Sequence, residues 1–311
     1  MAGASAARIL REAGLPVSLF DKGRGIGGRM ATRRLADGLT FDHGAQYVTA
    51  RDPAFAADMA SWTRSGVAAP WGEPGWSVGV PGMPEPVRSL LEGCTVTTGC
   101  TISRLVREES GWILCDADGD RLPSLFSTVL ITTPAPQARA LATPVAEAWP
   151  ALHEALARVR YAPCWALMLS YPGEPAFTQT HRRESDAAAP IAWIARDGTK
   201  PGRVAGRESL VVHASPSWSK VHLEDERPAV VAQLTAELRR VLGPSLPAPE
   251  ALAAHAHRWR YALVEQALGE PCLWSPDLRL GVAGDGCLGG RVEAAYLSGR
   301  ALAERVLAAA A

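Results

Sequence analysis

The segment from Val17 to Met30 limits the possible folds more than any other part of the chain. It reads VSLFDKGRGIGGRM, an apolar run followed by Asp21, four glycines and Arg29. A parallel strand that ends in a carboxylate can present both oxygens to the ribose hydroxyls of a dinucleotide. Glycines let the backbone approach phosphate closely, and arginine offers a planar fork of donors to a diphosphate. The segment predicts a dinucleotide-binding α/β fold; a strand with a flexible surface loop is the alternative.

The residues before this segment match only part of the usual dinucleotide fingerprint. Residues 1–14 are rich in alanine and predict a helix that Gly14 ends. A dinucleotide fold requires a strand, then G-x-G-x-x-G, then a helix, and residues 1–3 resemble only the last positions of that motif. We therefore expect the first strand of the sheet and two glycines to be missing from the given chain. A protein that started at Met1 should be unstable and bind dinucleotide poorly.

Composition excludes several classes of protein. The formal net charge is zero, which argues against a nucleic-acid partner because phosphate binding requires a basic surface. No run of 18 apolar residues and no signal peptide is present, so we expect a cytoplasmic protein without a membrane span. The six cysteines form no CxxC pair, and we expect free, mostly buried thiols.

Hydrophobic patterns predict two units. We assign residues 1–69, 87–150 and 272–311 to a discontinuous FAD-binding unit of Rossmann type, and residues 70–86 and 151–271 to an α+β substrate unit. The first unit should contain a hairpin around Asp37-Gly38, a helix at 53–66, a long loop at 71–86, and strands at 95–98, 102–108, 112–117 and 127–134. The second should contain strands at 164–171, 191–196 and 210–214 and a helix at 227–242. A strand at 280–286 and a helix at 291–310 should close the first unit.

Four segments together carry a family resemblance: DKGRGIGGRMATR (21–33), FDHGAQY (41–47), HRWRYA (257–262) and GDGCLGGRVE (284–293). The chain resembles bacterial renalase-like flavoproteins, part of the wider amine-oxidase-like group with a glutathione-reductase type FAD fold. The resemblance runs from Met1 to the last helix. The absent first strand departs from the family pattern.

The resemblance implies FAD held non-covalently. Asp21 would bind the adenosine ribose, Arg29 the diphosphate, Ile102 the adenine side, and Asp285 the ribityl or diphosphate end. Gln46 and Tyr47 would surround the isoalloxazine, and the backbone amides of Arg291 and Val292 would face its N1–C2 carbonyl edge, where reduced flavin carries negative charge. The remaining residues expected at the cofactor are Gly3, Ser5, Lys22, Arg24 and Gly28.

The family's activity is the oxidation of dihydronicotinamide isomers that carry hydride at ring carbon 2 or 6. Hydride passes to flavin N5, NAD(P)+ leaves, and dioxygen reoxidises the flavin to give hydrogen peroxide. The donor ring becomes aromatic, so positioning is the main contribution of the protein and no general base is assigned. The partners are this substrate and dioxygen; the oligomeric state and the NAD or NADP preference stay open.

Several residues allow two interpretations. His43 could polarise a substrate group or be structural, and Trp259 and Tyr261 could wall the substrate pocket or belong to the core. Arg258 and Arg260 could face a phosphate or the opposite side of the strand. His255 and His257 alternate onto one strand face, but no third metal ligand lies near, so no metal site is assigned. For Cys287, a buried thiol is favoured over covalent flavin attachment.

Three functions remain open: the renalase-like oxidase, an amine oxidase, and an N-terminally truncated flavoprotein without activity. The amine oxidase would require an aromatic pair flanking the flavin face, which no sequence feature establishes. The truncated form would be colourless and prone to aggregate.

Overall fold

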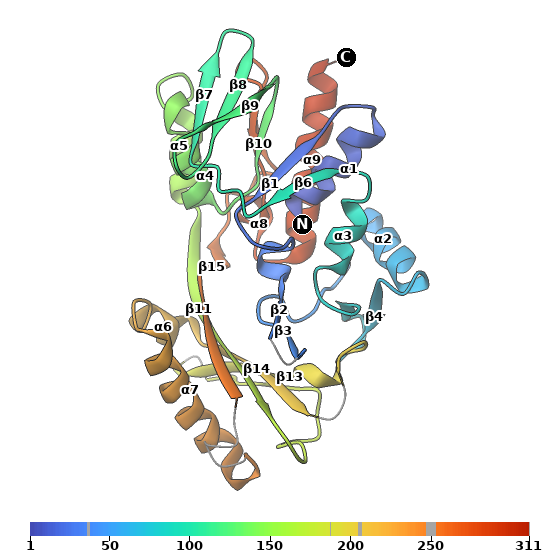
Figure 1. The fold of residues 1–311 in the computed structure, drawn as a ribbon, viewed down its shortest axis with the longest axis vertical. Coiled ribbons are helices and arrows are strands. Elements are labelled where there is room, and N and C mark those ends of the chain that lie inside the picture. The colour runs from blue at the N-terminus through green and yellow to red at the C-terminus, as the bar shows by residue number, and fades with distance from the viewer. Residues whose placement is uncertain (36–37, 187, 205–206, 247–252, 311) are drawn as a thin grey trace.

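The computed structural model describes residues 1–311 except 36–37, 187, 205–206, 247–252 and 311. Figure 1 shows an upper unit of helices and small sheets and a lower unit built on one sheet. The long strands β11 (Arg160–Tyr171) and β15 (Ala253–Gln266) run from one unit into the other. The fold is therefore mixed α/β with a second α+β part, as predicted.

The parallel strands of the upper unit form two separate ladders. Strand β1 (Ser18–Asp21) pairs in parallel with β6 (Thr95–Thr98), and β10 (Val129–Ile131) pairs in parallel with β17 (Leu280–Val282). Strand β16 (Leu273–Ser275) joins β17 antiparallel. In the described part of the chain, no strand is bonded between β1 and β10. The dinucleotide-type sheet is thus divided beside the start of α1.

Helix α1 (Ala2–Glu12) lies against the last helix, α9 (Val292–Ala310), because small residues let their backbones meet. A Cβ atom on Gly299 would lie 2.1 Å from the carbonyl oxygen of Ala2. Gly14 has φ +83°, the left-handed conformation expected where a helix ends. The two helices therefore bring both ends of the chain together.

The lower sheet has the order β12-β13-β14-β11-β15, and all its pairs are antiparallel. One face packs against α7 (Arg227–Leu242) in an apolar core that includes Leu167, Val212 and Leu234. The opposite face carries Met168 and Val211, which pack with residues of the upper unit. Alternate residues of each strand thus build two different cores, as the pleat requires. The face toward the upper unit is the one available to a site between the two.

The structure corrects some predicted elements. Residues 71–86, expected as one loop, contain β5 (Ser77–Gly79), which pairs with β4 (Ala68–Pro70), and the start of α3 (Glu85–Leu90). The short strands escaped prediction because Gly, Pro and Trp around them hide the alternation. The strand β9 (Arg121–Phe126) and the first residues of β11 were also missed. The hairpin β2–β3 is confirmed, although Asp37 in its turn lies outside the described residues.

The other elements are β2 (Thr32–Arg34), β3 (Thr40–Asp42), β7 (Arg104–Glu108), β8 (Gly111–Cys115), β12 (His181–Arg183), β13 (Ile191–Arg196), β14 (Glu208–Ala214), α2 (Pro53–Arg64), α4 (Ala135–Leu141), α5 (Pro150–Arg158), α6 (Pro216–Val221), α8 (Asp285–Leu288), and the 3₁₀ turns η1 (Gly28–Met30), η2 (Thr143–Val145), η3 (Asp197–Thr199) and η4 (Gly243–Ser245). All six cysteines are free, and four of them are buried, as predicted. None of the described helices is long and apolar enough to cross a membrane.

Candidate flavin site

The glycine-rich loop after β1 and the turn after β17 meet through one ion pair. Arg29 donates from both terminal nitrogens to the two oxygens of Asp285, each at 2.6 Å, and also to the carbonyl oxygen of Ala262 at 3.1 Å. The Asp285 side chain is 9% exposed, so this carboxylate depends on its partner. The structure therefore brings together Arg29 and Asp285, which the sequence placed at one cofactor. It also shows that each already satisfies the other.

The amino end of α1 lies beside both of these residues and Asp21. Burial lowers the pKa of the Met1 α-amino group to about 6, and the charges of Arg29, Asp21 and Asp285 act on it. Asp21 accepts from the Gly23 backbone N–H at 2.7 Å through one oxygen. Asp21 and Asp285, which follow different strands, thus both act on the amino end of α1, and the carboxyl ends of parallel strands are where α/β sheets bind nucleotides.

Two buried hydroxyls lie on the elements that meet here, Ser5 Oγ on α1 and Thr133 Oγ1 after β10. Within the described residues, neither atom has a hydrogen-bond partner. A Cβ atom on Gly3 would lie 2.8 Å from Thr132 Oγ1, so the helix start and the strand end are in close contact. A dinucleotide requires hydroxyl and helix N–H donors for its phosphates and a carboxylate that accepts from its ribose hydroxyls. The residues present fit FAD.

The amino end of α9 is fixed by a buried carboxylate. Glu293 accepts from the backbone N–H groups of Arg51 and Asp52, at 2.5 and 2.7 Å, and from the Arg291 side chain at 2.5 Å. The Arg291 guanidinium also bonds to Thr49. The side chain of Arg291 is thereby occupied, and its backbone N–H, predicted to face the flavin, donates to the carbonyl oxygen of Gly289 at 2.8 Å. The first N–H groups within α9 itself, from Val292 on, have no intrahelical acceptor. These amides are the feature that can face an electron-rich flavin edge.

A second set of residues faces this region from the lower sheet. The ring of His43 lies 4.7 Å from that of His257 and 4.9 Å from that of Trp259, centroid to centroid. The carbonyl oxygen of His43 accepts from Trp259 Nε1 at 2.9 Å and from His213 Nε2 at 3.2 Å. The side-chain Nδ1 of His43 is buried, and a backbone hydrogen bond with Phe41 raises the pKa of the ring against the effect of burial. The predicted pair His43 and Trp259 is therefore in contact.

Burial holds all three of these histidines neutral. It lowers the pKa of His43, His213 and His257 to about 4 in each case, against an ordinary value of 6.5. Beyond burial, His43, Arg227 and Arg33 lower the pKa of His257 further. The cluster thus offers uncharged imidazole and indole rings, with Arg33 and Arg227 acting on His257 and with Arg33 and Asp42 acting on His43 in opposite directions.

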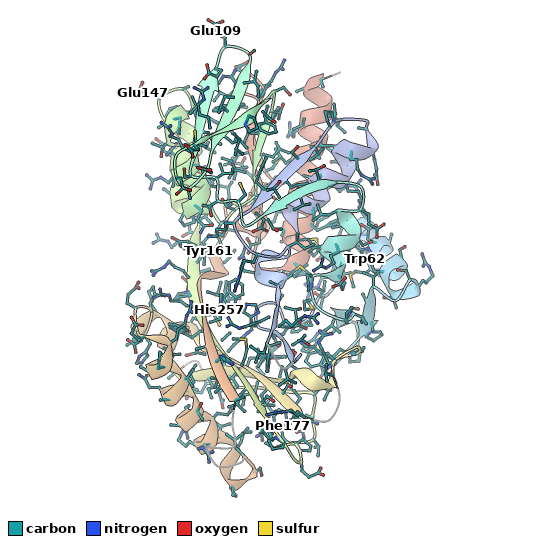
Figure 2. All side chains as sticks on the ribbon, viewed as in Figure 1. Trp62, Glu109, Glu147, Tyr161, Phe177 and His257 are labelled. Carbon is teal, nitrogen blue, oxygen red and sulfur yellow. The ribbon has the colours of Figure 1, made fainter. Side chains whose placement is uncertain are left out.

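Tyr261 takes part in a different group. It lies 5.9 Å from Tyr161, ring to ring, and the Arg29 guanidinium stands 5.7 Å above the Tyr161 ring. Burial raises the pKa of Tyr161 to about 12, so its hydroxyl stays protonated. In Figure 2, Tyr161 and His257 both lie in the neck between the two units. Sequence analysis did not predict Tyr161 at the site; it lies near the start of β11.

The flavin-loop residues Gln46 and Tyr47 point in different directions. Gln46 is 7% exposed and donates to the carbonyl oxygens of Asp42 and Gly44. Tyr47 stacks on Trp76 at 3.6 Å with an interplanar angle of 4°. Gln46 is thus used within its own loop, and Tyr47 belongs to an aromatic group at the junction of the two units.

The remaining predicted residues lie around this centre. Lys22, Arg24 and Gly28 are exposed on the glycine-rich loop, and Ile102 is partly buried between β6 and β7. The contacts of these four residues with the cofactor stay predictions.

The structure bears on two questions left open by the sequence: the direction of the Arg258 and Arg260 side chains, and the state of the Cys287 thiol. Arg258 and Arg260 both pair with Glu224, at 2.9 and 2.7 Å, so they lie on the opposite side of β15. Cys287 is buried in α8, and burial raises the pKa of its thiol to about 11, which keeps it protonated. Neither group is free to react at the cofactor in this arrangement.

Sequence reasoning missed a buried polar cluster next to the flavin loop. Lys200 pairs with Asp42 at 3.1 Å and with Asp197 at 2.7 Å, and all three side chains are fully buried. The spacing of Asp197 and Lys200 in a Pro-Gly segment was the available signal, but such a segment usually lies in a solvated loop. Only the packing of the two units buries it.

Comparisons with known proteins agree with this geometry. A family described as flavin containing amine oxidoreductase matches residues 51–307, and one described as NAD(P)-binding Rossmann-like domain matches residues 1–62. Among solved structures, the chain is similar to cyclohexylamine oxidase from Brevibacterium oxydans IH-35A, with a TM-score of 0.68, 14% identity, and coverage of 98% of this chain and 96% of that one.

Two further structures show the range of the likeness. A wild-type putrescine oxidase bound to putrescine has a TM-score of 0.67 and 13% identity, with 99% and 97% covered. A putative protoporphyrinogen oxidase from Exiguobacterium sp. 255-15 has a TM-score of 0.56 and 15% identity, with 75% of this chain covered; the match spans about half of that protein, 52%. The structural likeness concerns the fold, whereas the family match covers most of the sequence. The chain is therefore a flavin-dependent oxidoreductase of the flavin-containing amine oxidoreductase family.

Proposed function

We propose that this protein is a renalase-like oxidase: it binds FAD non-covalently and oxidises 2- or 6-dihydro isomers of NAD(P). Bound FAD would accept the hydride and pass two electrons to dioxygen, which yields hydrogen peroxide. The protein's contribution is to orient the dihydropyridine ring and to exclude water. No proton donor is required, because the substrate ring becomes aromatic when hydride leaves.

The charge around the candidate substrate face carries this proposal. The face consists of neutral histidines beside Trp259, and the charged side chains that act on His257 are Arg33 and Arg227. A positive field repels a protonated amine and attracts a substrate that carries a diphosphate. Trp259 and His43 offer flat surfaces on which a dihydronicotinamide ring can stack.

An amine oxidase is the second candidate, because the family and two of the similar structures are amine oxidases. The aromatic rings of Tyr161 and Tyr261 are the feature of this chain that favours it. They meet at 64°, however, and Arg29 covers one of them, so they do not form an open cage for an amine.

Anaerobic flavin bleaching separates the two candidates. The yellow protein is mixed in a stopped-flow instrument with borohydride-reduced NAD isomers and, separately, with putrescine and cyclohexylamine. Rapid bleaching by the dihydronicotinamide isomers, followed by peroxide formation on admission of oxygen, supports the proposal. Rapid bleaching by amines alone would overturn it, and ordinary 4-dihydro-NADH serves as the matched control for the position of the hydride.

A further inference from the structure

Four charged side chains are buried together where the two units meet. Asp42 lies at the end of β3 in the upper unit, and Asp197, Lys200 and Arg203 follow β13 in the lower unit. The side chains of Asp42, Asp197 and Lys200 are 0% exposed and that of Arg203 is 2% exposed. Two acidic and two basic side chains thus lie together, and buried charges require such partners. Burial raises the pKa of Asp197 in spite of Lys200 and Arg203.

The cluster is closely bonded. Lys200 Nζ lies 3.1 Å from Asp42 Oδ2 and 2.7 Å from Asp197 Oδ1, and Arg203 pairs with Asp42. Thr32 Oγ1 donates to Asp42 at 2.5 Å. Burial raises the pKa of Asp42, but Lys200 and Arg203 outweigh burial and hold it below its usual value. Asp42 is therefore the ionised acceptor around which the cluster is built.

Lys200 also reaches the predicted flavin loop. Its Nζ donates to Gln46 Oε1 at 3.5 Å, while Gln46 Nε2 donates to the carbonyl oxygens of Asp42, at 2.5 Å, and Gly44, at 2.9 Å. The amide nitrogen thus donates inside the loop, where it also lies 3.4 Å from His213 Nε2, and the amide oxygen points to the ammonium group. Since an ammonium group has no acceptor, this contact fixes which way the amide is turned.

The same loop is held from the sheet at a second point. A carbonyl oxygen can only accept, so the Nε2 of His213 must carry the proton in its bond to His43 O. Trp259 Nε1 donates to the same oxygen. The lower unit therefore holds residues 42–46 through Lys200 at Asp42 and Gln46, and through Arg203 at Asp42. His213 and Trp259 hold the same segment at the carbonyl oxygen of His43.

We infer that Lys200 is a positioning residue: from the substrate unit, it sets the orientation of the Gln46 amide and the path of residues 42–46 beside the flavin. This inference rests on the proposed flavin site and is independent of which substrate is oxidised. Lys200 acts through Gln46 and does not touch the reacting atoms. Through Lys200, the position of the substrate unit relative to residues 42–46 affects the midpoint potential of the flavin.

A double-mutant cycle tests this role. Lys200→Met, Gln46→Met and the double variant are purified with FAD, and the midpoint potential and absorption spectrum of the flavin are measured. Each single variant should shift the potential, and the double variant should shift it no further than Gln46→Met alone. Shifts that add would overturn the inference, because independent sites are additive.

Arg196→Met is the matched control. Arg196 ends β13, next to Asp197, and makes a bonded pair with Glu208, with side chains 15% and 7% exposed. Its loss removes a comparable ion pair that does not touch Gln46. It should lower stability and leave the flavin potential unchanged. An equal shift in this control would show that Lys200 is only structural and would refute the inference.

Hydrogen exchange gives a readout that requires no flavin. The N–H of Ala45 donates to the carbonyl oxygen of Arg29 at 2.8 Å, and its exchange should rise about tenfold or more in Lys200→Met and not in Arg196→Met. Unchanged protection of Ala45 would overturn the inference. If Lys200→Met does not fold, the K200M/D197N variant is used in its place in the double-mutant cycle. This variant removes the Lys200 ammonium group together with the carboxylate of its partner Asp197. Failure of the wild type to bind FAD would instead overturn the proposed function and leave the exchange test valid.

Discussion

Arg29 and Asp285 are separated by 256 positions in the chain and bonded to one another through two contacts of 2.6 Å. The arginine closes the glycine-rich loop after β1, and the aspartate begins α8 after β17. Their pairing joins the first and last parts of the polypeptide at the carboxyl ends of parallel strands. The same pair therefore stabilises the meeting of these two segments.

Arg29→Met should destabilise the protein by about 3 kcal/mol, since it leaves the largely buried Asp285 carboxylate without a partner. Chemical unfolding monitored by tryptophan fluorescence measures the loss. The R29M/D285L variant should recover part of it, because it removes both charges. A double variant as unstable as the sum of the single changes would contradict a direct pair.

Asp21→Asn should weaken FAD binding by about tenfold to a hundredfold, because a neutral amide loses the charge-assisted bonds to ribose hydroxyls. Flavin fluorescence titration of the apoprotein gives the dissociation constant. Glu12→Gln, an exposed change at the end of α1, is the control and should leave the constant unaltered. Unweakened binding in Asp21→Asn would remove the ribose role.

Gly44→Ala should lower both stability and FAD affinity. A Cβ at this position would lie 2.0 Å from the carbonyl oxygen of Arg29, so backbone must move, at a cost of about 1–3 kcal/mol. Gly25→Ala is the matched control, since nothing lies within 4 Å of its added Cβ, and it should stay within about 0.5 kcal/mol of the wild type. Thermal unfolding with and without FAD compares the two, and equal effects would contradict the close approach.

Acid should destabilise the protein through its buried histidines. Because burial lowers the folded-state pKa of His213 from 6.5 to about 4, its contribution to stability is fully present above pH 6.5. It is lost progressively as the pH falls to about 4, at about 1.4 kcal/mol per pH unit. Urea unfolding across this range measures the slope. His213→Gln should have a shallower slope; an unchanged slope would assign the effect to other groups.

Trp259→Phe should weaken substrate binding while leaving FAD bound. The variant keeps a flat ring but loses the Nε1 donor to His43 O, so the bond from His213 Nε2 to this oxygen stays while that from Trp259 is lost. We expect a several-fold higher KM for dihydronicotinamide isomers, because one lost hydrogen bond weakens binding by about 1 kcal/mol. Steady-state peroxide production measures it. A fall in kcat with unchanged KM would argue that Trp259 acts elsewhere than at the substrate.

Local sequence determined the main elements because their signals lie within a few residues. The apolar run before Asp21 forms β1, Asp52 caps α2 as Pro53 begins it, and the alanine-rich ends form α1 and α9. The glycine-rich turn and its flanking charges indicated a nucleotide cofactor, and the family match supports a flavin. The short strands at 68–70 and 77–79 were not predictable, since they are paired only through the fold around them.

The tertiary structure alone decided how distant residues meet. The sequence assigned Arg29 and Asp285 separately to the cofactor, whereas packing of the first and last segments bonds them to each other. The sequence alone could not predict that Lys200 would be fully buried beside Asp42 and Gln46, because the burial of a charge depends on which residues cover it in the fold. Within a few residues, the sequence determines which functional groups each segment contains. Only the long-range contacts between the two units determine which charged side chains are removed from water and therefore require partners.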